Sequence, residues 1–251
     1  MNSPTISKFA AKNVLRWGAW LILSAVAATI GSSQAFAQTN AATTTKTSSK
    51  VAAKKTAATP DAAASAAPVK TFGNKNAPIT MEVFSDYQCP SCGSFFEQTL
   101  RPLLGPDGYV AAGKVYLVHR DFPLPMHAYS HQAARWANAA AKIGKFQDVD
   151  AVLFDNQAAW GADGNIEKYV AQALSPADFK RVQKLMTGCE PTSTSCPLDA
   201  YIASDQELGK SVPVQATPTF VIFYKGQKYP ASSGIVTYPI LKQFFDSLLS
   251  Q

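Results

Sequence analysis

The sequence has 251 residues, of which 47% are hydrophobic and 11% aromatic, a composition that excludes a collagen-like or wholly disordered chain. Its formal net charge of +6 is concentrated near the N-terminus. Residues 1–37 contain three basic residues and no acidic one, and residues 38–70 contain five lysines and one aspartate. The rest of the chain, 71–251, carries 15 basic and 16 acidic residues. This near-neutral part gives no support to nucleic-acid binding.

The first 37 residues follow the pattern of a secretory signal peptide. Three basic residues precede an apolar run over 17–30, and the segment ends in Ala-Phe-Ala at 35–37. The apolar run is shorter than the roughly 20 residues that a membrane span needs. We therefore predict cleavage before Gln38 and a location in the periplasm or another extracytoplasmic compartment. The alternative is an uncleaved leader that tethers the protein to the membrane.

Residues 38–70 form a segment in which 21 of 33 residues are Ala, Thr or Ser, with scattered lysines. They show no apolar periodicity and include no aromatic residue. Such a segment cannot bury enough apolar surface to offset the entropy of ordering. We predict a disordered spacer here and a folded domain over 71–251.

The folded part is predicted to have the order β-α-β, a block of helices, then β-β-α. Apolar β-rich runs predict strands, and longer segments between turn residues predict helices. The predicted strands cover 79–84, 115–121, 219–224 and a short piece near 228–229. The predicted helices cover 93–104, with its first turn at Pro90, then 128–142, 145–155, 165–174, 176–187, 198–209 and 237–249.

Cys89-Pro90-Ser91-Cys92 is the first motif that carries chemistry. Two thiols separated by two residues on the first turn of a helix are close enough to form a disulfide. The first sulfur lies where unpaired backbone N–H groups and the helix dipole converge, which favours the thiolate and lowers its pKa. We predict that Cys89 is the exposed attacking sulfur and Cys92 the buried resolving one. Because a stabilised thiolate stabilises the reduced form, their disulfide would be an oxidant.

Thr217-Pro218, directly before the predicted strand 219–224, is the second motif. A proline at this place is also compatible with an ordinary strand edge. In a redox fold, a cis peptide bond here would turn the backbone toward the active-site sulfur. The Thr217 backbone would then pair with an extended substrate by strand addition. The two motifs together are more specific than either alone.

The segments FSDYQCPSC, HRDFPLPMH, the Ala-rich helical block and VQATPTFVIF resemble, in this order, the DsbA-like group of the thioredoxin superfamily. The resemblance covers about 71–251. It implies an α/β fold of the thioredoxin type with an all-helical insertion, about 125–212, between the second strand and the cis-proline strand.

The resemblance also implies the role of each motif residue. Cys89 matches the nucleophile, Cys92 its resolving partner, and Pro218 the cis-proline, which Thr217 precedes. Pro90-Ser91 matches the two positions that tune the reduction potential, and it differs there from the Pro-His of the best-known oxidases.

The function that the resemblance implies is thiol–disulfide oxidoreductase activity outside the cytoplasm. We expect a dithiol oxidase that introduces disulfides into exported proteins and is reoxidised by a membrane quinone-linked partner of the DsbB or VKOR type. We expect a monomer that uses the Cys89–Cys92 disulfide and needs neither a small-molecule cofactor nor a metal. The alternatives are a reductase or isomerase of the same fold and, in a different class, a non-catalytic substrate-binding or chaperone module.

Two carboxylates are candidates for proton transfer to or from Cys92. Glu82 lies on the first predicted strand, as a buried acid does in related oxidases, but one residue away from the usual spacing. Asp86, within the run FSDYQC, is the competing candidate.

Cys189 and Cys196 flank a segment rich in proline and hydroxyl residues, which predicts a turn between helices. We expect a structural disulfide that closes this turn, and a second redox pair is the alternative.

Metal binding is not expected. A zinc site built from the four cysteines would need closer spacing in the second pair and reduced thiols. His127 and His131, with His119 nearby, are interpreted as surface or packing residues, because no acidic residue stands at a matching spacing.

Overall fold

The computed structural model describes residues 67–251, so the expected signal peptide and most of the expected spacer lie outside the described residues. The strands are β1 (Thr71–Phe72), β2 (Ile79–Ser85), β3 (Val115–Asp121), β4 (Thr219–Tyr224), β5 (Gln227–Lys228) and β6 (Ser232–Ser233). The helices are α2 (Pro90–Phe95), the π-helical turn η1 (Phe96–Leu100), α3 (Arg101–Leu104), α4 (Ser130–Lys142), α5 (Phe146–Asp155), α6 (Gln157–Asp163), α7 (Ile166–Ala173), α8 (Pro176–Leu185), α9 (Asp199–Ser211) and α10 (Tyr238–Leu249).

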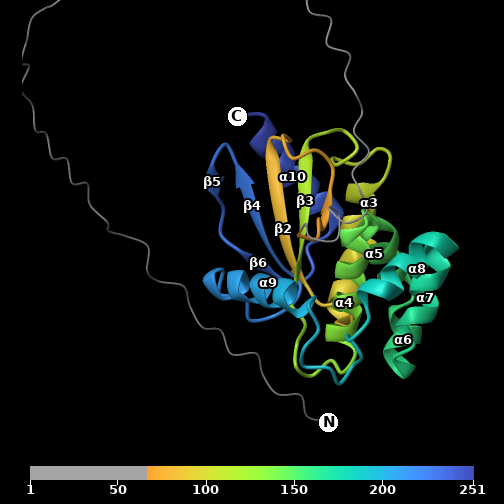
Figure 1. The fold of residues 1–251 in the computed structure, drawn as a ribbon. Helices are drawn as coiled ribbons and strands as arrows, with labels where there is room; N and C mark the ends of the chain where they lie inside the picture. Colours follow the sequence, from red (N-terminus) through yellow and green to blue (C-terminus); the bar gives the residue numbers. More distant parts are fainter. Residues whose placement is uncertain (1–66) are drawn as a thin grey trace, which may run out of the picture. The chain divides into compact units, whose positions relative to one another are not determined.

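One mixed sheet forms the centre of the described part, with the strand order β1-β3-β2-β4-β5 and with β6 also paired to β4. β2 and β3 run parallel, whereas β2 and β4 run antiparallel. Figure 1 shows the block α4 to α8 on the β3 side of the sheet and α10 against the sheet. The fold is therefore α/β and thioredoxin-like, as predicted, with α4 to α9 following β3 and preceding β4 in the chain.

The central strands form because their sequences suit burial on both faces. Most β2 residues are buried, and five of the six residues of β4 are buried as well. Phe95 from α2 stacks on Phe220 of β4, with ring centroids 5.7 Å apart. This contact fixes the helix that carries the cysteine pair against the sheet.

The segment from α2 through η1 to α3 is helical throughout, as predicted, but it widens into a π-helical turn over 96–100. Pro102, two residues after this turn, has no N–H to donate to it, which accounts for the interruption of the α-helical pattern.

The helical block agrees with the predicted helices to within about two residues at each end, except at α6. α6 has no predicted counterpart, because it is only seven residues long and follows the end of α5 after one residue. Within residues 67–251, no helix is long and apolar enough to cross a membrane.

The folded part begins earlier than the predicted boundary between 70 and 71. Lys70, assigned above to the spacer, is only 6% exposed, and its ammonium group pairs with Asp121 of β3 and Asp205 of α9. Its backbone carbonyl also accepts a hydrogen bond from the N–H of His119. The composition of the sequence did not indicate that Lys70 is part of the fold, because its partners lie far along the chain.

Candidate active site

Cys89 occupies the N-cap of α2, immediately after the central strand β2 and a short loop. Its carbonyl oxygen accepts the first helical hydrogen bonds, from the N–H groups of Cys92 at 3.0 Å and Gly93 at 3.1 Å. Pro90 fits the first helical position, since a proline there lacks only an N–H that the helix does not use. Pro90 and Ser91 are exposed, so the motif lies at the protein surface.

The two thiols are free, and both are buried, with Cys89 7% exposed and Cys92 1% exposed. The predicted exposure of Cys89 is therefore wrong, because the loop that carries Thr217 lies against its sulfur. The pKa of Cys89 is lowered to about 5, first because the Cys92 thiol donates a hydrogen bond to it. The backbone N–H groups of Ser91 and Cys92 act in the same direction, against the opposing effect of burial. Burial raises the pKa of Cys92 well above its ordinary value, and the neighbouring Cys89 raises it further. The arrangement therefore favours one thiolate, on Cys89, beside a protonated thiol.

Thr217 and Pro218 lie beside this pair because β4 is registered antiparallel to β2. Phe84, near the end of β2, pairs with Thr219 at the start of β4, and the preceding loop then lies at the cysteine motif. The Thr217–Pro218 peptide bond is cis. The Cys89 thiol donates to the Thr217 carbonyl oxygen, with an Sγ–O distance of 3.4 Å.

The side chain of Thr217 also acts on Cys89. Its hydroxyl is buried and has no hydrogen-bond partner within the described residues. It contributes to lowering the pKa of Cys89. An unpartnered donor next to a nascent thiolate gains a partner when the thiolate forms, which favours the anion.

Glu82 does not contact the cysteine pair. It lies on β2, where its carboxylate accepts a hydrogen bond from the Arg120 guanidinium at 2.7 Å. Arg120 also pairs with Asp205 at 3.2 Å. The alternation of side chains along β2 explains this, because a shift by one residue turns a side chain to the other face of the sheet.

Asp86 lies next to Cys92 through its backbone. Its N–H donates to Cys92 Sγ at 3.4 Å. Its carboxylate is buried and is bonded to the N–H groups of Gln88 and Leu124, the Ser130 hydroxyl and His127 Nδ1. With four partners, this carboxylate joins the loop before the motif to the segment between β3 and the start of α4.

Gln157 of α6 is a residue that the sequence did not indicate. Its amide nitrogen donates to the carbonyl oxygens of Tyr87 at 2.7 Å and Cys89 at 2.9 Å. A Cβ atom on Gly93 would lie 2.5 Å from the Gln157 Oε1 atom, so glycine permits this close approach of α6 to α2. The helical block thus fixes the backbone of the cysteine motif from a helix that pattern alone does not predict.

A buried group of ionisable side chains lies next to the motif. The Tyr87 hydroxyl donates to Asp150 of α5 at 2.8 Å, and its ring stacks on His119 at 5.0 Å. His119 in turn lies 3.3 Å from Asp121 and 3.4 Å from Asp150. Burial raises the pKa of Asp150 to about 6.

The other end of this group contains Lys70. Burial alone would lower its pKa, but the carboxylates of Asp121 and Asp205 outweigh burial and raise it. Burial would raise the pKa of Asp121, and the charge of Lys70 holds it below its ordinary value instead. Because these residues come from β1, β3, α5 and α9 or their flanks, no local pattern could have found them.

The remaining expected residues are placed as follows. Cys189 and Cys196 form a disulfide that closes the turn between α8 and α9. Among residues 67–251, no group of His, Cys, Asp and Glu is arranged to hold a metal ion. His127 and His131 face Asp86 and Asp199, so carboxylates do accompany them, supplied by other segments of the chain.

The comparison with known protein families matches residues 65–235 to the family described as thioredoxin. This range contains the cysteine pair, the helical block and Thr217–Pro218. The chain belongs to the thioredoxin family.

Among solved structures, several DsbA proteins have a fold similar to that of this chain. Wolbachia pipientis α-DsbA1 is 18% identical, with a TM-score of 0.58 over 72% of this chain and 91% of that one. BdbD from Bacillus subtilis, in its oxidised form, is 20% identical, with a TM-score of 0.56 over 74% of this chain and 97% of that one. Pseudomonas aeruginosa DsbA2 is 22% identical, with a TM-score of 0.53 over 73% and 95%. The fold of residues 67–251 is therefore similar to that of these DsbA proteins, with the helices α4 to α9 between β3 and β4.

A curated relative of a different description also matches. It is the Na⁺/H⁺ antiporter NhaA 3 of Salinispora tropica, 28% identical over 170 residues, which are 62% of this chain and 22% of that protein. The chain therefore corresponds to about a fifth of the length of that relative.

Proposed function

We propose that this thioredoxin-family protein is an exported thiol–disulfide oxidoreductase that oxidises dithiols in other exported proteins. The observation that carries the proposal is the asymmetry of the pair, with the pKa of Cys89 lowered to about 5 and that of Cys92 raised. A sulfur that is stable as a thiolate is a good leaving group, so the disulfide that contains it is readily reduced by substrate thiols.

The reaction begins with the Cys89–Cys92 disulfide. A substrate thiolate attacks Cys89 Sγ, a substrate–Cys89 bond forms, and the Cys89–Cys92 bond breaks. Cys92 leaves with the electron pair and takes up a proton, consistent with its raised pKa. A second substrate thiolate then attacks the substrate sulfur, which releases Cys89 as a thiolate. The substrate loses two electrons, and the protein gains them as one thiol and one thiolate.

Substrate binding is expected along the loop before β4. The Thr217 carbonyl already accepts a hydrogen bond from Cys89, and an extended substrate would add its own backbone beside it. An apolar groove of about 370 Å³ continues from β4 to α10 and includes Phe220, Ile240 and Phe244. Ile240 is 61% exposed there, so the groove would take an apolar side chain of the substrate.

Export rests on two features. Residues 1–37 have the signal-peptide pattern, although they lie outside the described residues. The Cys189–Cys196 disulfide is a bond that persists in oxidising compartments. In the periplasm or an equivalent compartment, a membrane quinone-linked protein would reoxidise the Cys89–Cys92 dithiol, and we propose that the oxidase works as a monomer.

Equilibration of the purified protein with glutathione tests the direction of electron flow. We expect a reduction potential nearer to the value of about −120 mV for DsbA than to that of about −270 mV for thioredoxin. A potential at or below the thioredoxin value would make the protein a reductase. Cys89→Ser should abolish dithiol oxidation, and retention of the protein's function in that variant would point to a non-catalytic binding module.

A further inference from the structure

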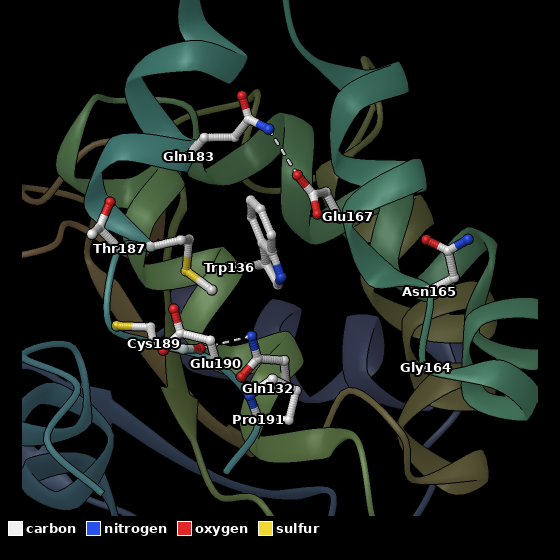
Figure 2. Close-up of a pocket in the computed structure, with 11 residues that line it drawn as sticks. Gln132, Trp136, Gly164, Asn165, Glu167, Gln183, Thr187, Cys189, Glu190 and Pro191 are labelled. Atoms are coloured by element: carbon white, nitrogen blue, oxygen red, sulfur yellow. Dashed lines mark hydrogen bonds between the residues drawn. The ribbon is translucent and has the colours of Figure 1, made fainter. Parts of the chain in front are cut away.

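The two cysteine pairs of the chain differ in what bonds to their sulfur atoms. Cys189 lines a cavity of about 480 Å³ between α4, α7 and α8, where the Gln132 amide donates to the Cys189 carbonyl oxygen at 3.0 Å (Figure 2). This contact holds the backbone, while the Cys189 sulfur is bonded to Cys196. At Cys92 a donor meets the sulfur itself, because the Asp86 N–H donates to Cys92 Sγ at 3.4 Å. Such a donor can act on the step in which the active-site disulfide opens.

Ser85, the last residue of β2, is the second donor at Cys92. Side chains alternate between the two faces of a strand, so Ser85 shares a face with Met81 and Val83. These two residues pack in the same core cluster as Cys92, whereas Phe84 packs in a separate cluster. Ser85 is therefore the one polar side chain on the Cys92 face of this strand. Its hydroxyl hydrogen-bonds Cys92 and lowers the pKa of that thiol, against the effect of burial.

Both donors are held in place by the surrounding fold. Ser85 is 4% exposed and pairs with Asp121 of β3, and its carbonyl oxygen accepts a hydrogen bond from the Phe122 N–H at 2.8 Å. Asp86 is fixed by the four partners of its carboxylate. Donors positioned in this way need no reorganisation when charge develops on the sulfur they face.

Besides Cys89, the strongest partners of Cys92 are neutral donors. Apart from burial and Cys89, the main influences on the pKa of Cys92 are a hydroxyl and a backbone N–H, and no described carboxylate is among them. Glu82 lies on the opposite face of β2, and the Asp86 carboxylate is bonded to four other groups. Negative charge on Cys92 is therefore stabilised by hydrogen bonds from uncharged groups.

We propose that the Ser85 hydroxyl and the Asp86 N–H stabilise Cys92 as the leaving thiolate, which makes Ser85 a catalytic residue. The inference rests on the thiol–disulfide exchange proposed above. When a thiolate attacks Cys89 Sγ, its electron pair forms the new S–S bond, and the pair of the Cys89–Cys92 bond goes to Cys92 Sγ. Because Cys92 is only 1% exposed, the two donors replace water as its hydrogen-bond partners until the sulfur takes up a proton from solvent.

This role has a kinetic signature. Cys92 is neutral in the disulfide, and its raised pKa keeps it neutral in the reduced protein. Its negative charge exists only during exchange, so donors to that charge lower the barrier and leave the equilibrium unaffected. Removal of the Ser85 hydroxyl should therefore slow reduction and oxidation of the pair by the same factor, without a change in reduction potential.

Ser85→Ala in the full-length protein is the test. Reduction of the Cys89–Cys92 disulfide by dithiothreitol, followed by acid quenching and thiol labelling, should be about tenfold slower, as expected for the loss of one hydrogen bond to a charged group. The redox equilibrium with glutathione should stay the same. Thr99→Val is the matched control, since it removes a buried hydroxyl that is bonded to the Val236 carbonyl oxygen, and it should change neither quantity.

A second pair of variants separates catalysis from structural support. In Cys92→Ala the leaving sulfur is absent, so the further substitution Ser85→Ala should leave the alkylation rate of Cys89 unchanged. If Ser85 only shaped the motif, the alkylation rate would change in this background as well. Dithiothreitol exchanges with the pair whichever direction of electron flow the protein uses. The rate comparison therefore remains valid even if the measured potential contradicts the proposed oxidase function.

Three results would overturn the proposal. The first is an equal rate of reduction by dithiothreitol in Ser85→Ala and the unsubstituted protein. The second is a slower rate that is matched by a shift of the glutathione equilibrium, which would assign the effect to the stability of one redox state. The third is an altered alkylation rate of Cys89 when Ser85→Ala is added to Cys92→Ala.

Discussion

Cys89 Sγ lies 3.4 Å from the carbonyl oxygen of Thr217, a residue 128 positions later in the chain. The antiparallel pairing of β2 with β4 creates this proximity, since it aligns the end of one strand with the start of the other. The same loop supplies the buried hydroxyl that helps lower the pKa of Cys89. One contact between distant segments thus joins the nucleophile to the place where a substrate would pair.

Thr217→Val tests the contribution of that hydroxyl. The substitution removes a donor to the thiolate and keeps the shape of the side chain, so the pKa of Cys89 should rise by about half a unit to one unit. At about pH 4, where the thiol is protonated, the free energy of unfolding should stay the same or rise by up to about 1 kcal/mol, because a buried hydroxyl without a partner is removed. Ultraviolet absorbance of the thiolate and urea denaturation measure the two effects. Thr194→Val, at an exposed position, is the control and should change neither.

Cys92→Ala tests the largest contribution to the lowered pKa of Cys89. The Cys92 thiol is the first cause of the lowered pKa of Cys89, and alanine cannot donate a hydrogen bond. The pKa of Cys89 should therefore rise by roughly one unit or more, which a pH series of alkylation rates would detect. An unchanged alkylation profile would mean that the backbone N–H groups alone stabilise the thiolate.

Gln157→Ala tests the support that the helical block gives to the motif. Two carbonyl groups, on Tyr87 and Cys89, lose their shared donor. The reduced protein should lose about 1 to 2 kcal/mol of unfolding free energy, measured by chemical denaturation. Gln98→Ala, on the exposed side of the neighbouring η1 segment, should lose much less. Equal losses in the two variants would show that the Gln157 amide contributes nothing specific.

The raised pKa of Asp150 should make the free energy of unfolding depend on pH. Its pKa is raised from 3.8 to about 6 in the folded protein, so the folded state binds more protons than the unfolded state between these values. The contribution of this group to stability therefore falls as the pH rises through that window, by roughly 3 kcal/mol in total.

Asp150→Asn removes the titrating group and should remove this slope. The free energy of unfolding of the variant minus that of the unsubstituted protein should therefore increase as the pH rises from about 4 to about 7, as measured by urea denaturation across that range. Parallel pH curves for the two proteins would contradict the assignment.

The sequence predicts the central strands because β2, β3 and β4 are continuous β-rich runs, and their observed bounds differ from the predicted ones by at most one residue. The cysteine motif was equally visible, because its chemistry is encoded by adjacent residues. Lys70 and Gln157 were not, since each acts through partners that only the tertiary fold supplies. Glu82 shows the limit of spacing arguments, because one position along a strand directs its carboxylate to Arg120 instead of the cysteines.

The most direct test of the account is a pH titration of the reduced protein, followed by ultraviolet absorbance of the thiolate. We expect one transition with an apparent pKa of about 5, assigned to Cys89 by its loss in Cys89→Ser, while Cys92 stays protonated well above neutral pH. A Cys89 transition near the ordinary thiol value of about 8.5 would contradict the account, because the disulfide would then lack the stable leaving group that makes it an oxidant.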